Sequence, residues 1–383
     1  MNFLKYPGGK HSELPIIRKY MPEKINKYYE PFVGGGAVFF DIDIKKCFIN
    51  DKSCDLISLY SAVKKQDETF FTMLSNIDKS WKNAENFSKN NLDALKRIFE
   101  LYKNDVITKE EVEYMAFGFV EKNQSKILKI INYNDFIEKD TLLKETKDYL
   151  SRKLKDLKKI NKKNTISEDD LSATFEGVFK GSLYMYFRYL YNKSIHDKKI
   201  FKKGQVAALY LFIREMTYSS MFRFNANGDF NVPYGGISYN NKTFESRIAL
   251  YRSENIKNKL KSATIKSLDF YDFMKKYEPQ KDDFVFIDPP YDSEFSAYDQ
   301  SIFEQNDQKR LADYLINECE GMFMVVIKNT EFISSLYPAG KETKNGGKIN
   351  VIGFDKKYSV SFMNRNNKEC EHLVITNYEI KEE

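Results

Sequence analysis

The sequence predicts an α/β fold in which a long helical stretch interrupts a mostly parallel sheet. Short apolar runs near both ends of the chain, such as Phe284–Ile287 and Met322–Ile327, have the length and composition of buried strands. Helical stretches alternate with these runs, as an α/β sheet requires. Between Ser61 and Lys180 glycine nearly vanishes, and leucines recur at helical spacing. We therefore expect a sheet domain over 1–60 and 262–383 and a mostly helical insertion over 61–261.

Composition limits the classes of protein to consider. Of 383 residues, 42% are hydrophobic, which supports a sizeable core, and the net charge of +6 permits a polyanionic partner without requiring one. The four cysteines form no C-x-x-C pair and the three histidines are scattered, so we expect no metal site, reduced thiols and a cytoplasmic protein. The sequence shows no apolar run long enough to cross a bilayer, so no membrane association is expected.

The first motif is the stretch Lys5–Lys10, which reads K-Y-P-G-G-K. Pro-Gly-Gly forms a loop whose backbone can approach a ligand closely. The chain has no G-x-x-x-x-G-K-[ST] motif at this loop, which excludes a phosphate loop of the nucleoside-triphosphatase kind. A plain N-terminal turn is the alternative interpretation.

The second motif, Tyr28–Phe40, is typical of a strand, a glycine loop and then a helix. After it, Cys47–Asn50 reads as a second short strand, followed by Asp51. Asp51 lies 17 residues after Gly34, about the separation at which nucleotide-binding folds place a carboxylate on ribose hydroxyls. Loop and acid together predict a cofactor that contains a nucleoside, although a tight turn alone would explain the glycines.

The helical stretch carries a basic segment. Residues 121–163 hold 13 Lys and Arg against 7 Asp and Glu, a net charge of +6 that equals the charge of the whole chain. One interpretation is a surface for phosphate groups. The other, which we favour, is a solvated helical face in a lysine-rich protein.

The segment Tyr218–Gly235 predicts a β-hairpin, because Asn227-Gly228 stands between alternating residues. A two-stranded ribbon that carries Arg, Asn and aromatic residues has a shape that enters a DNA groove. A purely structural hairpin is the alternative. Further on, Ala263–Phe270 reads as a strand followed by an acid, Asp269.

The tetrapeptide Asp288-Pro289-Pro290-Tyr291 directly follows the apolar run Phe284–Ile287. Two prolines cannot continue a strand ladder, so the chain turns stiffly at the carboxyl end of a strand, where α/β sheets bind ligands. The Asp288 carboxylate and the Pro289 carbonyl can accept both hydrogens of an exocyclic amino group, and Tyr291 can stack on its ring. A strand that ends in a proline turn is the alternative.

The chain closes with a predicted helix over 303–315 and a predicted antiparallel hairpin of 358–362 with 372–376.

These motifs, in this order, resemble the Dam-like N6-adenine DNA methyltransferases of the alpha group, and the match covers most of the chain. The likeness rests on four stretches: K-Y-P-G-G-K at 5–10, E-P-F-V-G-G-G at 30–36, F-R-F-N to V-P-Y-G over 222–235, and D-P-P-Y at 288–291. There are departures, since Gln308 stands where many members carry His, and Ser219, Met221 and Phe222 differ from the residues of GATC readers. These departures leave the target sequence open.

The resemblance implies a Rossmann-like methyltransferase core with an inserted recognition domain whose hairpin spans 222–235, and it implies S-adenosylmethionine as the cofactor. By position, the residues expected to bind the cofactor are Tyr6, Lys10, Glu30, Pro31, Phe32, Gly34, Gly36, Asp51, Asp269, Phe270 and Asp288. The expected catalytic residues are Asp288, Pro289, Pro290 and Tyr291. The expected DNA contacts are Tyr218, Arg223, Asn225, Asn227 and Asn231.

The implied substrate is adenine in double-stranded DNA, flipped out of the helix before methylation, with a cognate restriction endonuclease as a candidate partner. Three other functions stay open at this point: methylation of cytosine N4, a catalytically silent DNA-binding subunit, and methylation of RNA or protein. For Arg223, the alternative to a base contact is a bond to a phosphate or to Asp229.

Overall fold

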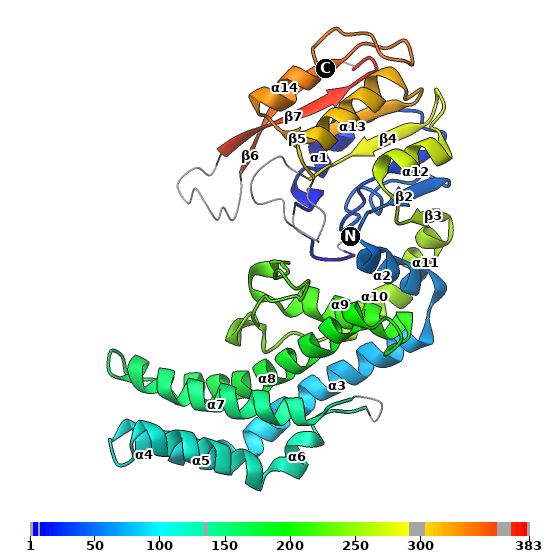
Figure 1. Ribbon diagram of the computed structural model, residues 1–383. Coiled ribbons are helices and arrows are strands. Elements are labelled where there is room, and N and C mark those ends of the chain that lie inside the picture. The colour runs from blue at the N-terminus through cyan, green and yellow to red at the C-terminus, as the bar shows by residue number, and fades with distance from the viewer. Residues whose placement is uncertain (1–2, 7, 134–136, 291–302, 358–368, 381–383) are drawn as a thin grey trace. The chain divides into compact units, whose positions relative to one another are not determined.

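The computed structural model describes residues 3–6, 8–133, 137–290, 303–357 and 369–380 (Figure 1). The chain divides into two compact units. The first comprises Met1–Lys64 and Glu254–Glu383, and the second comprises Lys65–Ser253.

The first unit is built on a mixed sheet, which has seven strands among the described residues. Its strands are β1 (Tyr28–Glu30), β2 (Cys47–Asn50), β3 (Ala263–Lys266), β4 (Phe284–Ile287), β5 (Met322–Lys328), β6 (Asn350–Lys357) and β7 (Glu369–Thr376). Its helices are η1 (Lys10–Ser12), α1 (Leu14–Tyr20), α2 (Cys54–Lys65), α11 (Glu254–Lys261), α12 (Phe270–Tyr277), α13 (Gln305–Asn317) and α14 (Glu331–Leu336).

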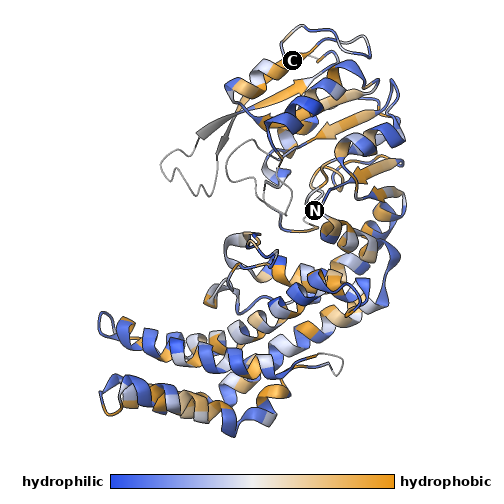
Figure 2. Ribbon diagram, viewed as in Figure 1, coloured by the Kyte–Doolittle hydropathy of each residue, from blue (hydrophilic) through white to orange (hydrophobic). Residues whose placement is uncertain are grey.

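The strands follow the order β3-β2-β1-β4-β5-β7-β6. Pairing is parallel from β3 through β5 and antiparallel from β5 through β7 to β6. All four residues of β4 are buried, which explains its unbroken apolar sequence, since a central parallel strand is covered on both faces. Figure 2 shows the same apolar character on β4 and β5. The expected α/β class with a mostly parallel sheet is confirmed.

The second unit is helical. It comprises α3 (Glu68–Asn90), α4 (Leu92–Lys103), α5 (Lys109–Lys122), α6 (Gln124–Leu128), α7 (Asp140–Asn161), α8 (Glu168–His196), α9 (Lys203–Met216), η2 (Tyr218–Ser220), η3 (Ile237–Tyr239) and α10 (Glu245–Arg252). Buried aromatic and aliphatic side chains, among them Trp81, Phe175, Tyr184 and Phe212, form its core. Within the described ranges, no helix is both long and apolar enough to span a membrane.

One local expectation was wrong. Residues 37–41 form hydrogen-bonded turns and not a helix, and the ring of Phe40 packs against those of Phe3, Phe39 and Tyr60. Residues 222–235 turn back on themselves, with isolated antiparallel bridges that join Phe224 to Phe230 and Thr217 to Tyr234, and within the described ranges they form no continuous strand. The predicted strand at 358–362 lies outside the described residues, and β7 pairs with β6 instead.

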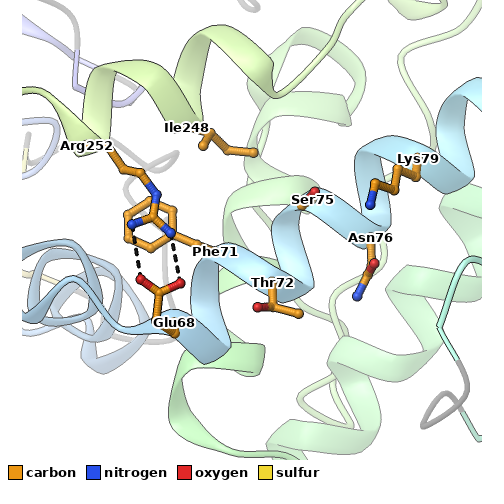
Figure 3. Close-up of a pocket in the computed structure, with 8 residues that line it drawn as sticks. All are labelled: Glu68, Phe71, Thr72, Ser75, Asn76, Lys79, Ile248 and Arg252. Atoms are coloured by element: carbon orange, nitrogen blue, oxygen red, sulfur yellow. Dashed lines mark hydrogen bonds and ion pairs between the residues drawn. The ribbon is translucent and has the colours of Figure 1, made fainter.

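A surface pocket of the second unit lies between α3 and α10 (Figure 3). The Arg252 guanidinium lies 3.9 Å from the centre of the Phe71 ring and forms two hydrogen bonds to the Glu68 carboxylate, of 3.1 and 2.9 Å. Because the guanidinium is engaged by an acid and an aromatic ring of its own unit, this contact stabilises the helix pair.

Candidate active site

The strand order places a switch point between β1 and β4. From β1 the chain continues to β2 on one side, and from β3 it crosses over to β4 on the other side. The glycine loop follows β1 and Asp288 follows β4, so both extend from the carboxyl ends of adjacent parallel strands. Ligands of open α/β sheets bind at such a point.

The glycine loop has a backbone that side chains would not tolerate. Gly34 and Gly36 have φ angles of +47° and +72°, in the left-handed region that favours glycine. A Cβ atom on Gly36 would lie 2.5 Å from the Tyr60 hydroxyl oxygen, and one on Gly35 would lie 2.9 Å from the Leu4 carbonyl oxygen. The Tyr60 hydroxyl also donates to the Gly34 carbonyl at 3.0 Å.

Asp51 anchors this loop. Its two carboxylate oxygens accept hydrogen bonds from the backbone N–H groups of Gly34 and Ser53, each at 3.0 Å. Its side chain is half-buried directly after β2. The sequence predicted an acid near the glycines, and the structure adds that the acid fixes the shape of the loop.

Tyr6 and Lys10 complete the site from the N-terminal segment. The ring of Tyr6 packs on the loop, since a Cβ on Gly34 would lie 3.2 Å from its Cδ1 atom. Lys10 is only 2% exposed, and its Nζ lies 2.7 Å from Oδ1 of Asp288 and 3.5 Å from Oε2 of Glu13. A buried ammonium therefore holds the Asp288 carboxylate in place.

The proline turn after β4 is fixed from α13. The Gln308 side chain is fully buried and donates from Nε2 to the Pro290 carbonyl at 2.8 Å. Its Oε1 is buried and has no hydrogen-bond partner among the described residues. Pro289 is buried, and Tyr291 lies outside the described residues.

The glycine loop is joined to β1 through Glu30, Pro31 and Phe32. Glu30 is 2% exposed and accepts a hydrogen bond from the Tyr28 hydroxyl at 2.8 Å. Burial raises the pKa of the Glu30 carboxyl well above its usual range, the Tyr28 hydrogen bond lowers it, and the nearby charge of Asp288 raises it further. The Phe32 ring packs against Phe270, with centroids 5.6 Å apart.

Asp269 and Phe270 begin α12. The Asp269 carboxylate accepts the backbone N–H of Tyr271 at 3.0 Å, which caps the helix, and pairs with Arg310 at 2.9 Å. Phe270 is 3% exposed, and its ring is buried beside Phe32.

Asn50 is a site residue that the sequence interpretation missed. Its side-chain amide donates to the carbonyls of Pro31 and Leu268 at 3.1 and 3.0 Å, and its Oδ1 accepts from the Leu268 N–H at 2.9 Å. Asn50 thus ties the ends of β1, β2 and β3 together. Its position as the last residue of a buried strand, directly before Asp51, was the signal available.

The expected DNA contacts all lie in the second unit. Tyr218 is half exposed in η2, and Arg223 donates from Nε to Oδ1 of Asn231 at 3.1 Å. Oδ1 of Asn225 accepts the backbone N–H groups of Asn227 and Asp229 at 3.0 and 2.9 Å and so shapes the turn. Asp229 pairs with His196 at 2.8 Å, and within the described ranges Arg223 bonds Asn231 with no bond to Asp229.

Comparison with known proteins identifies the family. The family model for D12 class N6 adenine-specific DNA methyltransferases matches residues 6–347. The chain belongs to this family.

Three relatives illustrate the range of similarity. A type II methyltransferase, M1.LlaDCHI of Lactococcus lactis subsp. cremoris, is 24% identical over 384 residues, which cover 98% of this chain and 95% of the relative. M.MjaIII of Methanocaldococcus jannaschii, also a type II methyltransferase, is 25% identical across 94% of this chain and 98% of the relative. The DNA adenine methylase of Escherichia coli (strain K12) is 41% identical over 68 residues, which cover 18% of this chain and 24% of the relative.

Membership of this family decides between the functions left open by the motifs. The chain is an adenine-specific DNA methyltransferase, which selects adenine N6 over cytosine N4 and DNA over RNA or protein. It also selects an enzyme over a silent binding subunit, in agreement with an intact Asp288 beside an intact glycine loop.

Proposed function

We propose that this methyltransferase takes its methyl group from S-adenosylmethionine, bound at the carboxyl ends of β1, β2 and β4. The glycine loop supports this proposal, because Gly34 and Gly36 leave backbone atoms open to close approach by a flat ligand. Asp51 suits ribose hydroxyls, since a carboxylate offers about four acceptor sites and can serve both the loop and a ligand. The Tyr6 ring packs on Gly34 and so lies beside the same loop.

The observation that carries the proposal is the position of Asp288. Its carboxylate follows β4 at the switch point, beside the loop after β1, and is fixed by the buried Lys10 ammonium at 2.7 Å. A preorganised acceptor next to a nucleoside-binding loop is the arrangement that methylation of an amino group requires.

Asp288 and the Pro289 carbonyl are the proposed acceptors for the two N6 hydrogens of adenine. Their hydrogen bonds draw the nitrogen toward a tetrahedral shape and direct its lone pair at the methyl group. When bound, S-adenosylmethionine would supply that methyl group from a positively charged sulfur, which would keep the electron pair of the broken S–C bond. The extra proton on N6 passes to the Asp288 carboxylate.

Orientation supplies much of the remaining rate enhancement. Lys10 fixes Asp288 from one side, and Gln308 fixes the Pro290 carbonyl from the other. Tyr291 is the proposed stacking partner of the flipped adenine. Glu30, Pro31, Phe32, Asp269 and Phe270 shape the cofactor site through packing and hydrogen bonds.

The proposed DNA substrate is a duplex from which the target adenine is flipped, at an energetic cost of a few kcal/mol. In this proposal the first unit carries the chemistry and the second recognises DNA. Arg223 reads a guanine edge, Tyr218 stacks near the extruded base, and Asn225, Asn227 and Asn231 shape and extend the reading turn. Because two relatives of full length are type II methyltransferases, a restriction endonuclease of the same specificity is the proposed partner.

Tritiated methyl transfer from S-adenosylmethionine to plasmid DNA, followed by nucleoside analysis, tests the proposal. The label is expected in N6-methyladenine. The variant Asp288→Ala should lose at least about 10²-fold in kcat, the usual cost of one preorganised charge-stabilising group, and should still bind duplex DNA. A wild-type rate in this variant would refute the mechanism, and label in another nucleoside would refute the assigned reaction.

A further inference from the structure

Helix α8 carries a row of polar side chains that form hydrogen bonds with the segment 229–240. The row consists of residues four apart, namely Lys180, Tyr184, Arg188, Asn192 and His196. Side chains at this spacing form a ridge along one side of a helix. Each of the five forms a hydrogen bond or an ion pair with the segment.

The middle residues of the row form hydrogen bonds with the backbone on both sides of Asn231. Asn192 forms two hydrogen bonds with Phe230, donating to its carbonyl at 3.1 Å and accepting from its N–H at 2.9 Å. The Val232 carbonyl accepts from the Tyr184 hydroxyl at 2.9 Å and from Arg188 Nη1 at 3.2 Å. Side chains of α8 thus provide the hydrogen bonds that a neighbouring strand would provide in a sheet.

Fixing Phe230 and Val232 also fixes the residue between them. Phe230 and Val232 are buried, with exposed fractions of 1% and 0%. Asn231 lies between these two buried residues, and successive side chains of an extended chain point to opposite sides. Its Oδ1 accepts the Nε–H of Arg223 at 3.1 Å. The Arg223 carbonyl accepts the Asn231 N–H at 3.1 Å, so this pair is joined through both backbone and side chain.

The contact with Asn231 sets what Arg223 can offer to DNA. With Nε–H engaged, the two terminal nitrogens of the guanidinium are the donors available to a ligand. Two parallel donors match the O6 and N7 acceptors of guanine, and that match depends on the angle at which the guanidinium is held.

We propose that Asn192 is a positioning residue for base reading: it holds the backbone at Phe230, and through Asn231 it sets the angle of the Arg223 guanidinium. This role, which rests on the proposed function of Arg223, belongs to a helix residue that does not itself contact a base. Tyr184 acts in the same way from Val232, on the other side of Asn231.

The test compares discrimination between DNA sites in five proteins, one of which is a control variant. Sequencing of methylated positions in cells that express the wild type first defines the site. The ratio of kcat/KM for that site to kcat/KM for sites changed at one G·C pair is then measured for the wild type, Asn192→Leu, Arg223→Ala and the double variant. Lys193→Leu is the matched control, because Lys193 lies beside Asn192 on α8 but pairs with Glu138.

Arg223→Ala should lower the ratio at one position of the site by about 5- to 150-fold, the range for one bidentate arginine–guanine contact. Asn192→Leu should lower it at the same position by roughly tenfold, and the double variant should lose no more than Arg223→Ala alone. Lys193→Leu should leave the ratio unchanged. Circular dichroism and thermal unfolding identify any variant that fails to fold.

Other results would overturn the inference. If Arg223→Ala relaxes one position but Asn192→Leu slows methylation of all sites equally, Asn192 is only structural while Arg223 keeps its role. If Arg223→Ala itself leaves the ratio unchanged, both roles fall. Should Asn192→Leu not fold, Tyr184→Phe, which removes a single hydroxyl, must relax the same position by a measurable factor, and an unchanged ratio refutes the inference.

Discussion

At the scale of single residues, Glu30 shows how the site and the stability of the first unit are linked. The carboxyl is buried beneath the glycine loop, and its pKa is raised well above its usual range, chiefly by burial. In the unfolded chain the pKa is near 4.5. Below that pH the carboxyl is protonated in both the folded and the unfolded state, and it makes its full contribution to stability. As the pH rises toward the folded-state pKa, the unfolded state alone ionises, and that contribution is lost.

We therefore predict that Glu30→Gln gains stability relative to the wild type as the pH rises from 5 to 8, because glutamine cannot ionise. The quantity to measure is the difference in free energy of unfolding between the two proteins, from urea titrations at each pH. The difference at pH 5 reports the effect of replacing an uncharged carboxyl group with an amide. Its increase with pH reports the cost of ionising the buried Glu30 carboxyl. A difference that stays constant across this range would show that Glu30 does not titrate as described.

The sequence predicted candidate site residues, but it could not predict several of the contacts that they form. The spacing between Gly34 and Asp51 predicted a carboxylate at the loop, and the structure places it there. Nothing local indicated that Arg223 bonds Asn231 or that Asp229 bonds His196. The second contact depends on how α8 lies against the segment, since His196 is 33 residues from Asp229 along the chain.

At the scale of elements, short buried strands were the most predictable feature. The runs at 47–50 and 284–287 became β2 and β4 with the expected bounds, because each is a short apolar run followed by polar residues or proline. The strand predicted within 263–270 became β3, which ends at Lys266. The segment after the glycine loop was predicted wrongly as a helix. There the chain forms turns, and Phe40 packs against Phe3, Phe39 and Tyr60.

The loop after β1 gives a prediction at this scale. Gly36→Ala should reduce stability by about 1–2 kcal/mol, the cost of a left-handed conformation in a residue with a Cβ. It should also weaken S-adenosylmethionine binding roughly tenfold or more, since the Cβ would displace the Tyr60 hydroxyl that bonds Gly34. Thermal unfolding and calorimetric titration measure the two effects.

Gly118→Ala is the matched control for this substitution. Gly118 lies within α5, and no atom approaches an added Cβ within 4 Å. Alanine there should stabilise the helix by up to about 1 kcal/mol and leave cofactor binding unchanged. Equal effects of the two substitutions would refute the special geometry assigned to Gly36.

At the scale of the whole molecule, the sequence predicted an α/β sheet interrupted by helices, because strand runs cluster at the two ends of the chain. It could not decide whether the basic stretch 121–163 binds phosphate or only covers a helical surface. The structure shows lysines of α7 paired with acids of the preceding helices and their connection. Lys147 pairs with Glu121, Lys155 with Glu113 and Lys158 with Asp105. Two of these acids lie outside the stretch, so counting charges within it overstates the charge available to DNA.

These pairs lead to the last prediction. Lys155 and Lys158 lower the pKa of the Glu113 and Asp105 carboxyls through hydrogen bonds, and Lys158 also donates to the Tyr102 carbonyl. Because these ammonium groups already bind α4, α5 or their connection, the combined variant Lys147→Gln, Lys155→Gln, Lys158→Gln should change affinity for duplex DNA by less than about twofold. The slope of log K against log salt concentration should stay at its wild-type value. If the three lysines bound phosphates, the slope would shrink by about 0.9 for each phosphate that is no longer neutralised, and a salt titration by fluorescence anisotropy separates the two results.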